Sequence, residues 1–201
     1  MKISRSMVAD IKFATFTEED ANWLKDYPKC EVDMGCARGH FLIGSAEKFP
    51  ETCFIGVEKS PVRVYKTQKK IDKLGLTNAR VFQDENGHFL NDFLSRSSVD
   101  VLHVLFADPW PKRRHHNRRL MQPPFFALAH RVVKPNGVLR FLTDDRPYFE
   151  WTSRFAKNQL GWEPLTHFEH EQNYPLTEFQ RKFTVRGLAI YSMWLRRRAL
   201  K

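Results

Sequence analysis

Short apolar runs alternate along the chain with longer segments in which apolar residues recur every three or four positions. The apolar runs predict five strands, at residues 30–36, 52–57, 80–83, 99–107 and 138–142. The longer segments predict four helices, at about residues 40–48, 61–74, 125–133 and 147–158. Such alternation is typical of an α/β fold with a mostly parallel sheet. Late antiparallel strands are expected in 183–195, so that six or seven strands form one doubly wound domain.

Capping residues mark where the predicted helices begin and end. Ser60 followed by Pro61 is typical of a helix start, and Gly75 stands where that helix should stop. The Pro-Asn-Gly tripeptide 135–137 is expected to end the helix of residues 125–133, before the fifth strand begins. These capping and turn residues therefore support the same order of elements as the apolar pattern.

Residues 1–29 precede the first predicted strand, and we expect them to form an N-terminal arm with a short helix. Within the arm, Thr17 is followed by three acidic residues, which indicates an N-cap and the first turn of a short helix. Residues 30–201 are expected to form one domain. Of all 201 residues, 42% are hydrophobic and 13% aromatic, which suffices for one core and argues against a disordered chain.

Cysteine content and hydropathy favour a cytoplasmic protein. The three cysteines, Cys30, Cys36 and Cys53, are odd in number and form no CxxC pair, which favours a reducing compartment over a disulfide scaffold. The most apolar stretch, 99–107, contains two polar residues and is far shorter than the roughly 18 residues of a membrane span. We expect no membrane span, and the N-terminal residues lack the hydrophobic region of a signal peptide.

Basic residues outnumber acidic ones and gather in one segment. The formal net charge is +10, from 33 Lys and Arg against 23 Asp and Glu. Residues 112–119 read KRRHHNRR, with five Lys or Arg, two His and no acid. A second basic cluster comprises Arg196, Arg197, Arg198 and Lys201. Because such clusters replace the counterions of phosphates, this distribution favours nucleic acid as a partner over a merely solvated surface.

Polar residues lie at the carboxyl ends of four predicted strands, where a doubly wound sheet binds its ligands. They are found at residues 33–39, at Glu58, at 108–110 and at 143–145. The turn 33–39 has the pattern G-x-A-x-G, in which Gly35 and Gly39 allow the backbone to approach a ligand closely. His40 stands where a dinucleotide fingerprint has its third glycine, which disfavours NAD and an NAD-dependent reductase.

A nucleoside-type cofactor without a pyrophosphate, such as S-adenosylmethionine, fits these residues. Asp33 can face the ammonium or sulfonium side of that cofactor, and Glu58 can accept hydrogen bonds from both ribose hydroxyls. The adenine is expected at the end of the third strand. There Asp84, Glu85 and Asn86 compete for its amino group, and we prefer Glu85.

Residues 108–119, with the sequence DPWPKRRHHNRR, form the most specific motif of the chain. They resemble the bacterial tRNA (guanine-N7-)-methyltransferase family, in which a D-P-W-x-K-x-x-H-x-x-R-R run follows the fourth strand. The resemblance covers about residues 30–195. Further matching pieces are 33–39, 56–58, 143–144 and 177–183. The chain departs from the family pattern at Ala37, which replaces a glycine, and at Gln180, which replaces an acid.

The resemblance implies the Rossmann-like, seven-stranded, mostly parallel sheet of the class I methyltransferases. It also implies methyl transfer from S-adenosylmethionine, leaving S-adenosylhomocysteine, to N7 of the variable-loop guanine at position 46 of tRNA, without a metal. From the residues and the resemblance together, cofactor contacts are expected at Asp33, Gly35, Gly39, Glu58, Glu85, Asn86 and Asp108. Asp108 is also the expected catalytic residue. Substrate contacts are expected at Lys112, Asp144, Thr177, Glu178, Phe179 and Gln180. Contacts to tRNA phosphates are expected at Arg113, Arg114, Arg118 and Arg119.

Methylation of guanine N7 places modest demands on these residues. N7 carries a lone pair and no proton at neutral pH, so no general base is needed. A carboxylate can stabilise the positive charge that develops on the purine, or accept hydrogen bonds from its N1–H and 2-amino groups together. Asp108 and Asp144 both remain open for the latter contact.

Other functions and assemblies also remain open from the sequence. One is a class I methyltransferase that acts on another RNA base, a protein or a metabolite. Another is an RNA-binding α/β module without catalysis, although acids gathered at four strand ends disfavour it. A monomer and a homodimer are equally compatible with the sequence.

Overall fold

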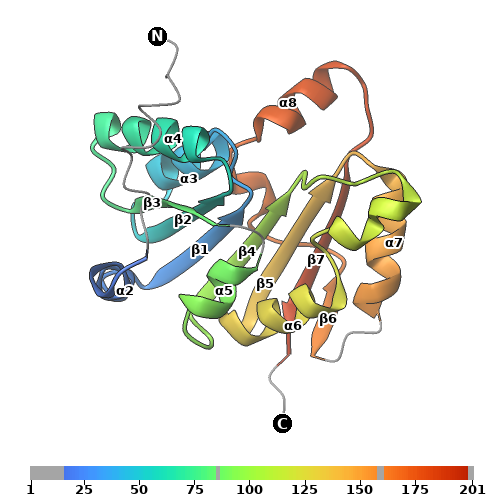
Figure 1. The fold of residues 1–201 in the computed structure, drawn as a ribbon, viewed down its shortest axis with the longest axis horizontal. Coiled ribbons are helices and arrows are strands. Elements are labelled where there is room, and N and C mark those ends of the chain that lie inside the picture. Colours follow the sequence, from blue (N-terminus) through green and yellow to red (C-terminus); the bar gives the residue numbers. More distant parts are fainter. Residues whose placement is uncertain (1–15, 85–86, 158–160, 199–201) are drawn as a thin grey trace.

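The computed structural model describes residues 16–84, 87–157 and 161–198, which form one seven-stranded sheet (Figure 1). The strands are β1 (Lys29–Met34), β2 (Thr52–Glu58), β3 (Ala79–Gln83), β4 (Val99–Leu105), β5 (Val133–Thr143), β6 (Trp162–Leu165) and β7 (Tyr191–Arg197). They lie in the order β3-β2-β1-β4-β5-β7-β6. The neighbours among β1 to β5 pair in parallel, whereas β7 is antiparallel to β5 and β6. The predicted mostly parallel, doubly wound sheet is confirmed.

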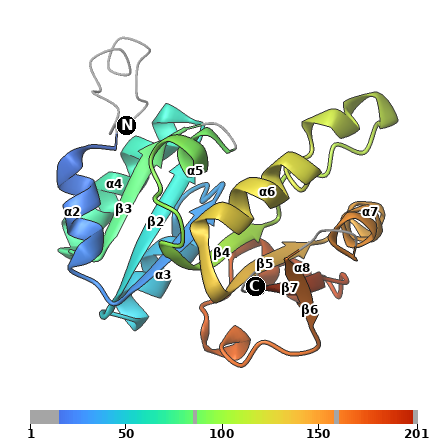
Figure 2. The ribbon, with the colours of Figure 1, turned by 90° about the horizontal axis from the view of Figure 1, so that it is seen from below.

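Helices cover both faces of this sheet. They are α2 (Glu18–Lys25), α3 (His40–Lys48), α4 (Pro61–Leu74), α5 (His88–Asp92), α6 (Pro123–Val132), α7 (Arg146–Lys157) and α8 (Glu178–Val185), with the 3-10 helices η1 (Arg113–Arg118) and η2 (Glu171–Asn173). Side chains of α2, α5, α6 and α7 pack on one face, and those of α3 and α4 pack on the other. In the ribbon of Figure 2, α6 and α3 lie on opposite sides of the sheet. None of the helices in the described ranges is both long and apolar enough to cross a membrane.

Two helices have the predicted bounds, and a third has the predicted cap. α3 and α4 begin and end as expected, and Gly75 closes α4 with a left-handed φ of 64°. Thr17 caps α2 in a reciprocal capping box with Asp20. Trp23 of α2 donates a hydrogen bond from Nε1 to the Thr77 carbonyl at 2.8 Å, so α2 is anchored next to the start of β3.

The tripeptide Pro135–Gly137 lies inside β5, and the expectation that it separates a helix from a strand was wrong. α6 ends and β5 begins at consecutive residues, and the register of β4 against β5 shifts between Val99 and Val101. The extra residues form a bulge in which Asn136 has a φ of 67°. A Cβ atom on Gly137 would lie 2.8 Å from a carbonyl oxygen of β4, so glycine is required there.

The C-terminal third differs most from the prediction. α8 occupies the first residues of the segment 183–195, where only strands were expected, because a capping box of Thr177 and Gln180 starts a helix. The antiparallel strand β7 confirms the expected direction, but it begins only at Tyr191. β6 was missed because it is a four-residue edge strand that contains Pro164. α5 and η1 were missed because they are too short to show a periodic pattern.

Candidate active site

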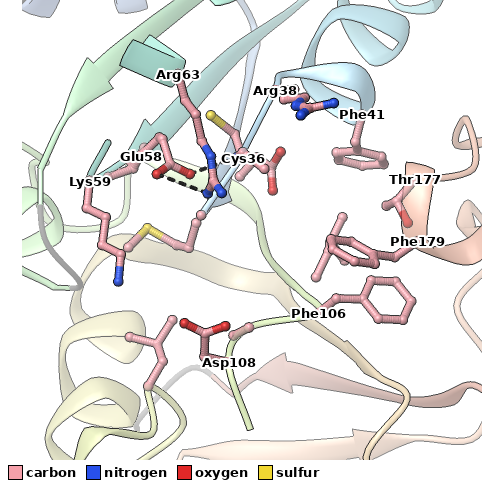
Figure 3. A pocket seen from close by; sticks show the side chains of 18 of the residues that line it. Cys36, Arg38, Phe41, Glu58, Lys59, Arg63, Phe106, Asp108, Thr177 and Phe179 are labelled. Atoms are coloured by element: carbon pink, nitrogen blue, oxygen red, sulfur yellow. Dashed lines mark hydrogen bonds and ion pairs between the residues drawn. The ribbon is translucent and has the colours of Figure 1, made fainter. Parts of the chain in front are cut away.

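A pocket of about 710 Å³ opens at the carboxyl ends of β1, β2 and β4. Residues that follow these strands line one side, and the first turn of α8 lines the other (Figure 3). Asp33, Glu58 and Asp108, which come from three different strand ends, all line this pocket. They meet because β1 lies between β2 and β4 in a parallel sheet.

The turn between β1 and α3 contains three left-handed residues. Gly35, Ala37 and Gly39 have φ angles of 80°, 51° and 70°. The backbone N–H groups of Gly35 and Cys36 donate to the Val57 carbonyl at 2.8 and 3.0 Å, which ties the turn to β2. Ala37 takes a left-handed conformation despite its Cβ, at a cost of about 1–2 kcal/mol. The alanine that replaces a glycine therefore still permits the turn.

Asp33 is a buried carboxylate on the pocket wall. The residue is 4% exposed, and within the described ranges its carboxylate makes no hydrogen bond or ion pair. Burial raises the pKa of Asp33 to about 7; Arg140 opposes this rise and Glu58 adds to it. A bound cation would favour the ionised form. Asp33 thus suits a positively charged ligand group.

Glu58 is also buried, but backbone groups hold it in place. Its Oε2 accepts a hydrogen bond from the Ala37 N–H at 3.1 Å, and its Oε1 accepts one from the Ser60 N–H at 2.8 Å. Arg63 Nη1 lies 3.6 Å from Oε1 (Figure 3). Because each carboxylate oxygen has two lone pairs, Glu58 can also accept hydrogen bonds from a ligand with adjacent hydroxyls.

Asp108 lies across the pocket in a strained segment. Phe106 and Trp110, two residues to either side, have positive φ angles of 57° and 43°. The Phe106 N–H donates to the Leu142 carbonyl at 2.8 Å, so the chain leaves the sheet directly afterwards. The two left-handed residues turn the backbone on both sides of Asp108, whose exposed carboxylate points into the pocket toward Glu58 (Figure 3).

The first turn of α8 forms the facing wall. Thr177, Glu178 and Phe179 line the pocket from this turn, and Figure 3 shows Thr177 and Phe179 there. Phe179 is 45% exposed, and its ring centroid lies 5.7 Å from that of Phe106 and 5.9 Å from that of Phe183. These three rings form an apolar surface on which a planar base can stack.

Comparison with known proteins assigns the chain to a family. Residues 28–193 match the family model described as "Putative methyltransferase". A tRNA (guanine-N(7)-)-methyltransferase of Staphylococcus haemolyticus is 30% identical over 181 residues, which cover 86% of this chain and 82% of the relative. One from Chromohalobacter salexigens is 37% identical over 160 residues, which cover 79% of this chain and 65% of the relative. The chain belongs to the bacterial tRNA (guanine-N7-)-methyltransferase family.

Solved methyltransferase structures share the fold of this family member. The 16S rRNA methyltransferase KamB has a TM-score of 0.68 and 18% identity, covering 92% of this chain and 96% of that chain. The antibiotic-resistance methyltransferase Kmr has a TM-score of 0.62 and 17% identity, covering 94% and 96%. This likeness concerns the fold, and it agrees with the expected class I sheet.

The basic run of the family motif forms η1 beside the pocket. Lys112, Arg113, Arg114 and Arg118 are exposed. The Arg118 guanidinium lies 5.0 Å from the Trp110 ring centroid and lines the pocket. Of these four side chains, Arg118 thus combines the pocket wall with the exposed basic surface.

Arg119, the last residue of the run, differs from the others. It is 3% exposed, its Nε donates to the Pro109 carbonyl at 2.7 Å, and its guanidinium lies 5.0 Å from the ring centroids of Tyr148 and Trp151. These contacts hold the backbone next to Asp108. We therefore correct the expected role of Arg119: its guanidinium supports the loop and is not presented to a phosphate.

Gln180 and Gly39 serve packing and lie outside the pocket lining. The Gln180 Oε1 accepts a hydrogen bond from the Thr177 N–H at 2.9 Å, and the Gln180 N–H donates to Thr177 Oγ1 at 3.0 Å. Glutamine serves as well as glutamate in a capping box, which explains how the family's acid can be replaced. A Cβ atom on Gly39 would lie 2.3 Å from Thr67 Cγ2, so this glycine allows α3 to pack against α4.

Two other expected contacts, Lys112 and Asp144, lie outside the pocket wall, and two fall on residues that the structure does not describe. Lys112 and Asp144 are exposed and do not line the pocket. Glu85 and Asn86 lie outside the described residues, although Asp84 beside them lines the pocket. Across residues 16–84, 87–157 and 161–198, no three His, Cys, Asp or Glu side chains gather closely enough to hold a metal ion.

The structure also reveals site residues that sequence reasoning missed. Arg38, Lys59, Arg63 and Phe106 line the pocket. Phe106 directly follows β4, but neither its positive φ nor its ring contacts can be inferred from one sequence. A polar residue within an otherwise apolar strand was a usable signal of a functional or paired side chain. Such a residue is rarely buried without a hydrogen-bond partner or a ligand.

Proposed function

We propose that this protein transfers a methyl group from S-adenosylmethionine to N7 of a tRNA guanine, at position 46 in the variable loop. The observation that carries the proposal is the meeting of Asp33, Glu58 and Asp108 in one pocket beside an exposed basic segment. The curated relatives carry the name of the N7 activity. We place the reaction in the cytoplasm, where tRNA is the partner.

The β1–β2 side of the pocket suits the cofactor, which when bound supplies a methyl group on a sulfonium centre. Asp33 holds the cationic amino-acid part, since its buried carboxylate has no partner of its own among the described residues. Glu58 accepts the ribose hydroxyls with the lone pairs that its backbone hydrogen bonds leave free. Glu85 remains our preferred contact for the adenine, and Gly35 leaves space for the ligand beside the backbone.

The Asp108 side of the pocket suits the guanine. N7 needs no base to remove a proton, so position and electrostatics are what the chain must supply. Holding two reacting groups in line can lower the barrier by up to about 7–11 kcal/mol. Asp108 stabilises the positive charge that develops on the purine. Between the two aspartates that the sequence left open, Asp108 is favoured for the base contact, because it lines the pocket and Asp144 does not.

The exposed basic segment binds the tRNA backbone. Arg113, Arg114 and Arg118 contact phosphates on either side of the extruded guanosine, and Lys112 acts next to the pocket. Phe179 offers its exposed ring to the base, a contact worth about 1–3 kcal/mol when stacking occurs. The guanosine is thus held by its base and its flanking phosphates together.

The test uses labelled S-adenosylmethionine and unmodified bulk tRNA, followed by chemical cleavage at N7-methylguanine. The expected result is label in tRNA and a single cleavage in the variable loop. Cleavage elsewhere would contradict the position, and labelled tRNA without cleavage would contradict N7 as the acceptor. Asp92→Asn on α5, an exposed aspartate outside the pocket, is the control and should leave labelling unchanged.

A further inference from the structure

A row of polar side chains crosses the middle of the sheet beneath the pocket. In the strand register Asp33 of β1 pairs with His103 of β4, His103 pairs with Arg140 of β5, and Arg140 pairs with Trp194 of β7. In-register neighbours present their side chains on the same face of a sheet. Asp33 on the pocket wall is therefore the first member of a polar row that continues into the core.

Arg140 is the charged centre of this row. It is 1% exposed, and its Nε and Nη2 each donate to one carboxylate oxygen of Glu171 at 2.5 Å. Its guanidinium lies 5.0 Å from the Tyr174 ring centroid and 5.5 Å from that of Phe41. Trp194 Nε1 donates to the same Glu171 at 3.0 Å. A buried guanidinium is thus bound in a two-pronged ion pair under aromatic rings.

The neighbours of Arg140 complete a network on the same face. His103 Nε2 lies 2.8 Å from Glu31, and the Tyr174 hydroxyl donates to both Glu31 oxygens at 2.9 Å. Burial lowers the pKa of His103, so the ring is neutral. With its proton on Nε2 toward Glu31, its Nδ1 can accept from Arg140 Nη1 at 3.5 Å. The network therefore carries one buried positive charge, on Arg140.

The same network reaches the substrate side of the pocket. Glu171 and Tyr174 belong to the segment that runs into Thr177 and the first turn of α8. Tyr174 and Thr177 are both buried, and only two residues separate them. The contacts of Arg140 and Glu31 with this segment thus fix the base of the wall that carries Phe179.

A buried ion pair of this kind adds little stability over an apolar replacement, because its desolvation cost offsets the attraction. Its position suggests what else it does. We propose that the buried charge of Arg140, which lies two strands from Asp33 on the same face of the sheet, favours the ionised form of this pocket carboxylate, and that the ion pair of Arg140 with Glu171 links this effect to the segment that carries the α8 wall. The proposal rests on the proposed function in one respect, since Asp33 is taken as the group that holds the cofactor's cation.

Several groups surround Asp33, and they set the sign of the expected effects. The nearest titratable and charged groups on the packed elements are Glu58, Glu31, Cys36, His103 and Arg140. Further charged or titratable residues line the same pocket, namely Arg38, His40, Lys59, Arg63, Asp84, Asp108 and Glu178. Burial keeps the Cys36 thiol neutral by raising its pKa, and His103 is neutral as well. Arg140 lowers the pKa of Asp33, so removing its charge should raise that pKa, whereas removing the opposing charge of Glu171 should lower it.

The test follows the titration of the Asp33 carboxyl carbon by ¹³C NMR in the full chain without ligand, with Asp33→Asn to assign the signal. The wild-type midpoint should lie near pH 7. In Arg140→Met it should rise by about one pH unit, in Arg140→Lys it should return toward the wild-type value, and in Glu171→Gln it should fall. Affinity for S-adenosylmethionine should follow the same midpoints. Glu171→Gln should also raise KM for tRNA several-fold with little change in kcat.

The matched control is Arg197→Met, which removes another buried arginine whose Nη1 donates to Ser97 and to the Val133 carbonyl. It should lower the melting temperature and leave the Asp33 midpoint unchanged. An unmoved midpoint in Glu171→Gln, or the same shift in Arg197→Met as in Arg140→Met, would overturn the proposal. If Arg140→Met does not fold, the fall in the Asp33 midpoint that is expected in Glu171→Gln still tests the proposal. Since the titration needs no ligand, a wild type that titrates as expected but methylates no tRNA would contradict the proposed function alone.

Discussion

On the β1–β2 side of the pocket the carboxylates are buried and surrounded by strand backbone, whereas on the β4–α8 side Asp108 is exposed between two strained residues. Glu58 takes its position from two backbone N–H groups, and Asp33 takes its position from the strand register. Asp108 depends instead on the positive φ angles of Phe106 and Trp110 and on the Arg119 contact to Pro109.

This difference matches what each side must admit. A small cationic ligand can enter a buried site, where low polarity strengthens its attraction to a carboxylate. A nucleotide that is still part of a large RNA can reach only an exposed site, and there stacking and phosphate contacts supply the binding. The pocket therefore combines a rigid, electrostatically tuned half with an open half built from loops.

The largest effect is expected at Asp108. Asp108→Asn should lower kcat for tRNA methylation by about 10²–10³-fold, because the charge facing the developing cation is lost. Affinity for S-adenosylmethionine, measured by isothermal titration, should change by less than about threefold, since Asp33 and Glu58 remain. Near wild-type turnover in both Asp108→Asn and Asp108→Ala would show that Asp108 does not stabilise the developing charge, and that the β4–α8 side does not carry this role.

In contrast to Asp108→Asn, Asp33→Asn should act mainly on cofactor affinity. Cofactor affinity at pH 8 should fall by about 10–100-fold, because the only charge lost is the one that faces the cation.

The ligand-free Asp33→Asn variant should be more stable than the wild type at this pH. The folded pKa of about 7 lies above the ordinary value of 3.8, so the wild type loses stability as pH rises between these values. The gain should be about 2–4 kcal/mol above pH 7 and should vanish near pH 4. Chemical denaturation at both pH values measures it, and equal stability at pH 8 would contradict the raised pKa.

The exposed arginines of the basic segment should contribute more to tRNA binding than the buried one. Replacing both Arg113 and Arg114 by alanine should weaken tRNA binding and reduce the slope of log affinity against log salt by about 1.4–1.8. The control pair Lys29→Ala and Arg96→Ala removes equal charge at the amino ends of β1 and β4, away from the pocket, and should change the slope much less. Filter binding at several salt concentrations distinguishes them, and equal slopes in the two double variants would argue against a dedicated phosphate surface.

Arg119→Ala tests whether this buried arginine supports the Asp108 loop or binds phosphate. Loss of its hydrogen bond and ring contacts should lower stability by about 1–3 kcal/mol and lower kcat through the Asp108 loop. The salt slope should stay at the wild-type value. A reduced slope in this variant would restore Arg119 to the phosphate contacts.

The smallest effect is expected at Gln180. Gln180→Glu should keep the capping box and change stability by less than about 0.5 kcal/mol, whereas Gln180→Ala should cost about 1 kcal/mol. Thermal unfolding measures both. A large gain of activity in Gln180→Glu would show that the acid found elsewhere in the family does more than cap α8.

Most secondary structure and three of the pocket acids were accessible to sequence reasoning. The bounds of α3 followed from the apolar pattern and those of α4 from capping residues, and Asp33, Glu58 and Asp108 followed from the rule that ligands gather at carboxyl ends of parallel strands. The failures were β6, α5 and η1, which are too short to show a periodic pattern, α8, whose capping box was not recognised, and the bulge at Pro135–Gly137, where strand pairing overrode a turn signal.

The sequence by itself determined the alternation of strands and helices, the acids at their ends and the basic run, because periodicity and capping act between residues close in the chain. Tertiary structure alone decided that Arg119 is buried, that the first turn of α8 lies beside the pocket, and that Asp33, His103 and Arg140 lie side by side. These facts depend on which strands pair and in what register, and that choice is made by packing over the whole core.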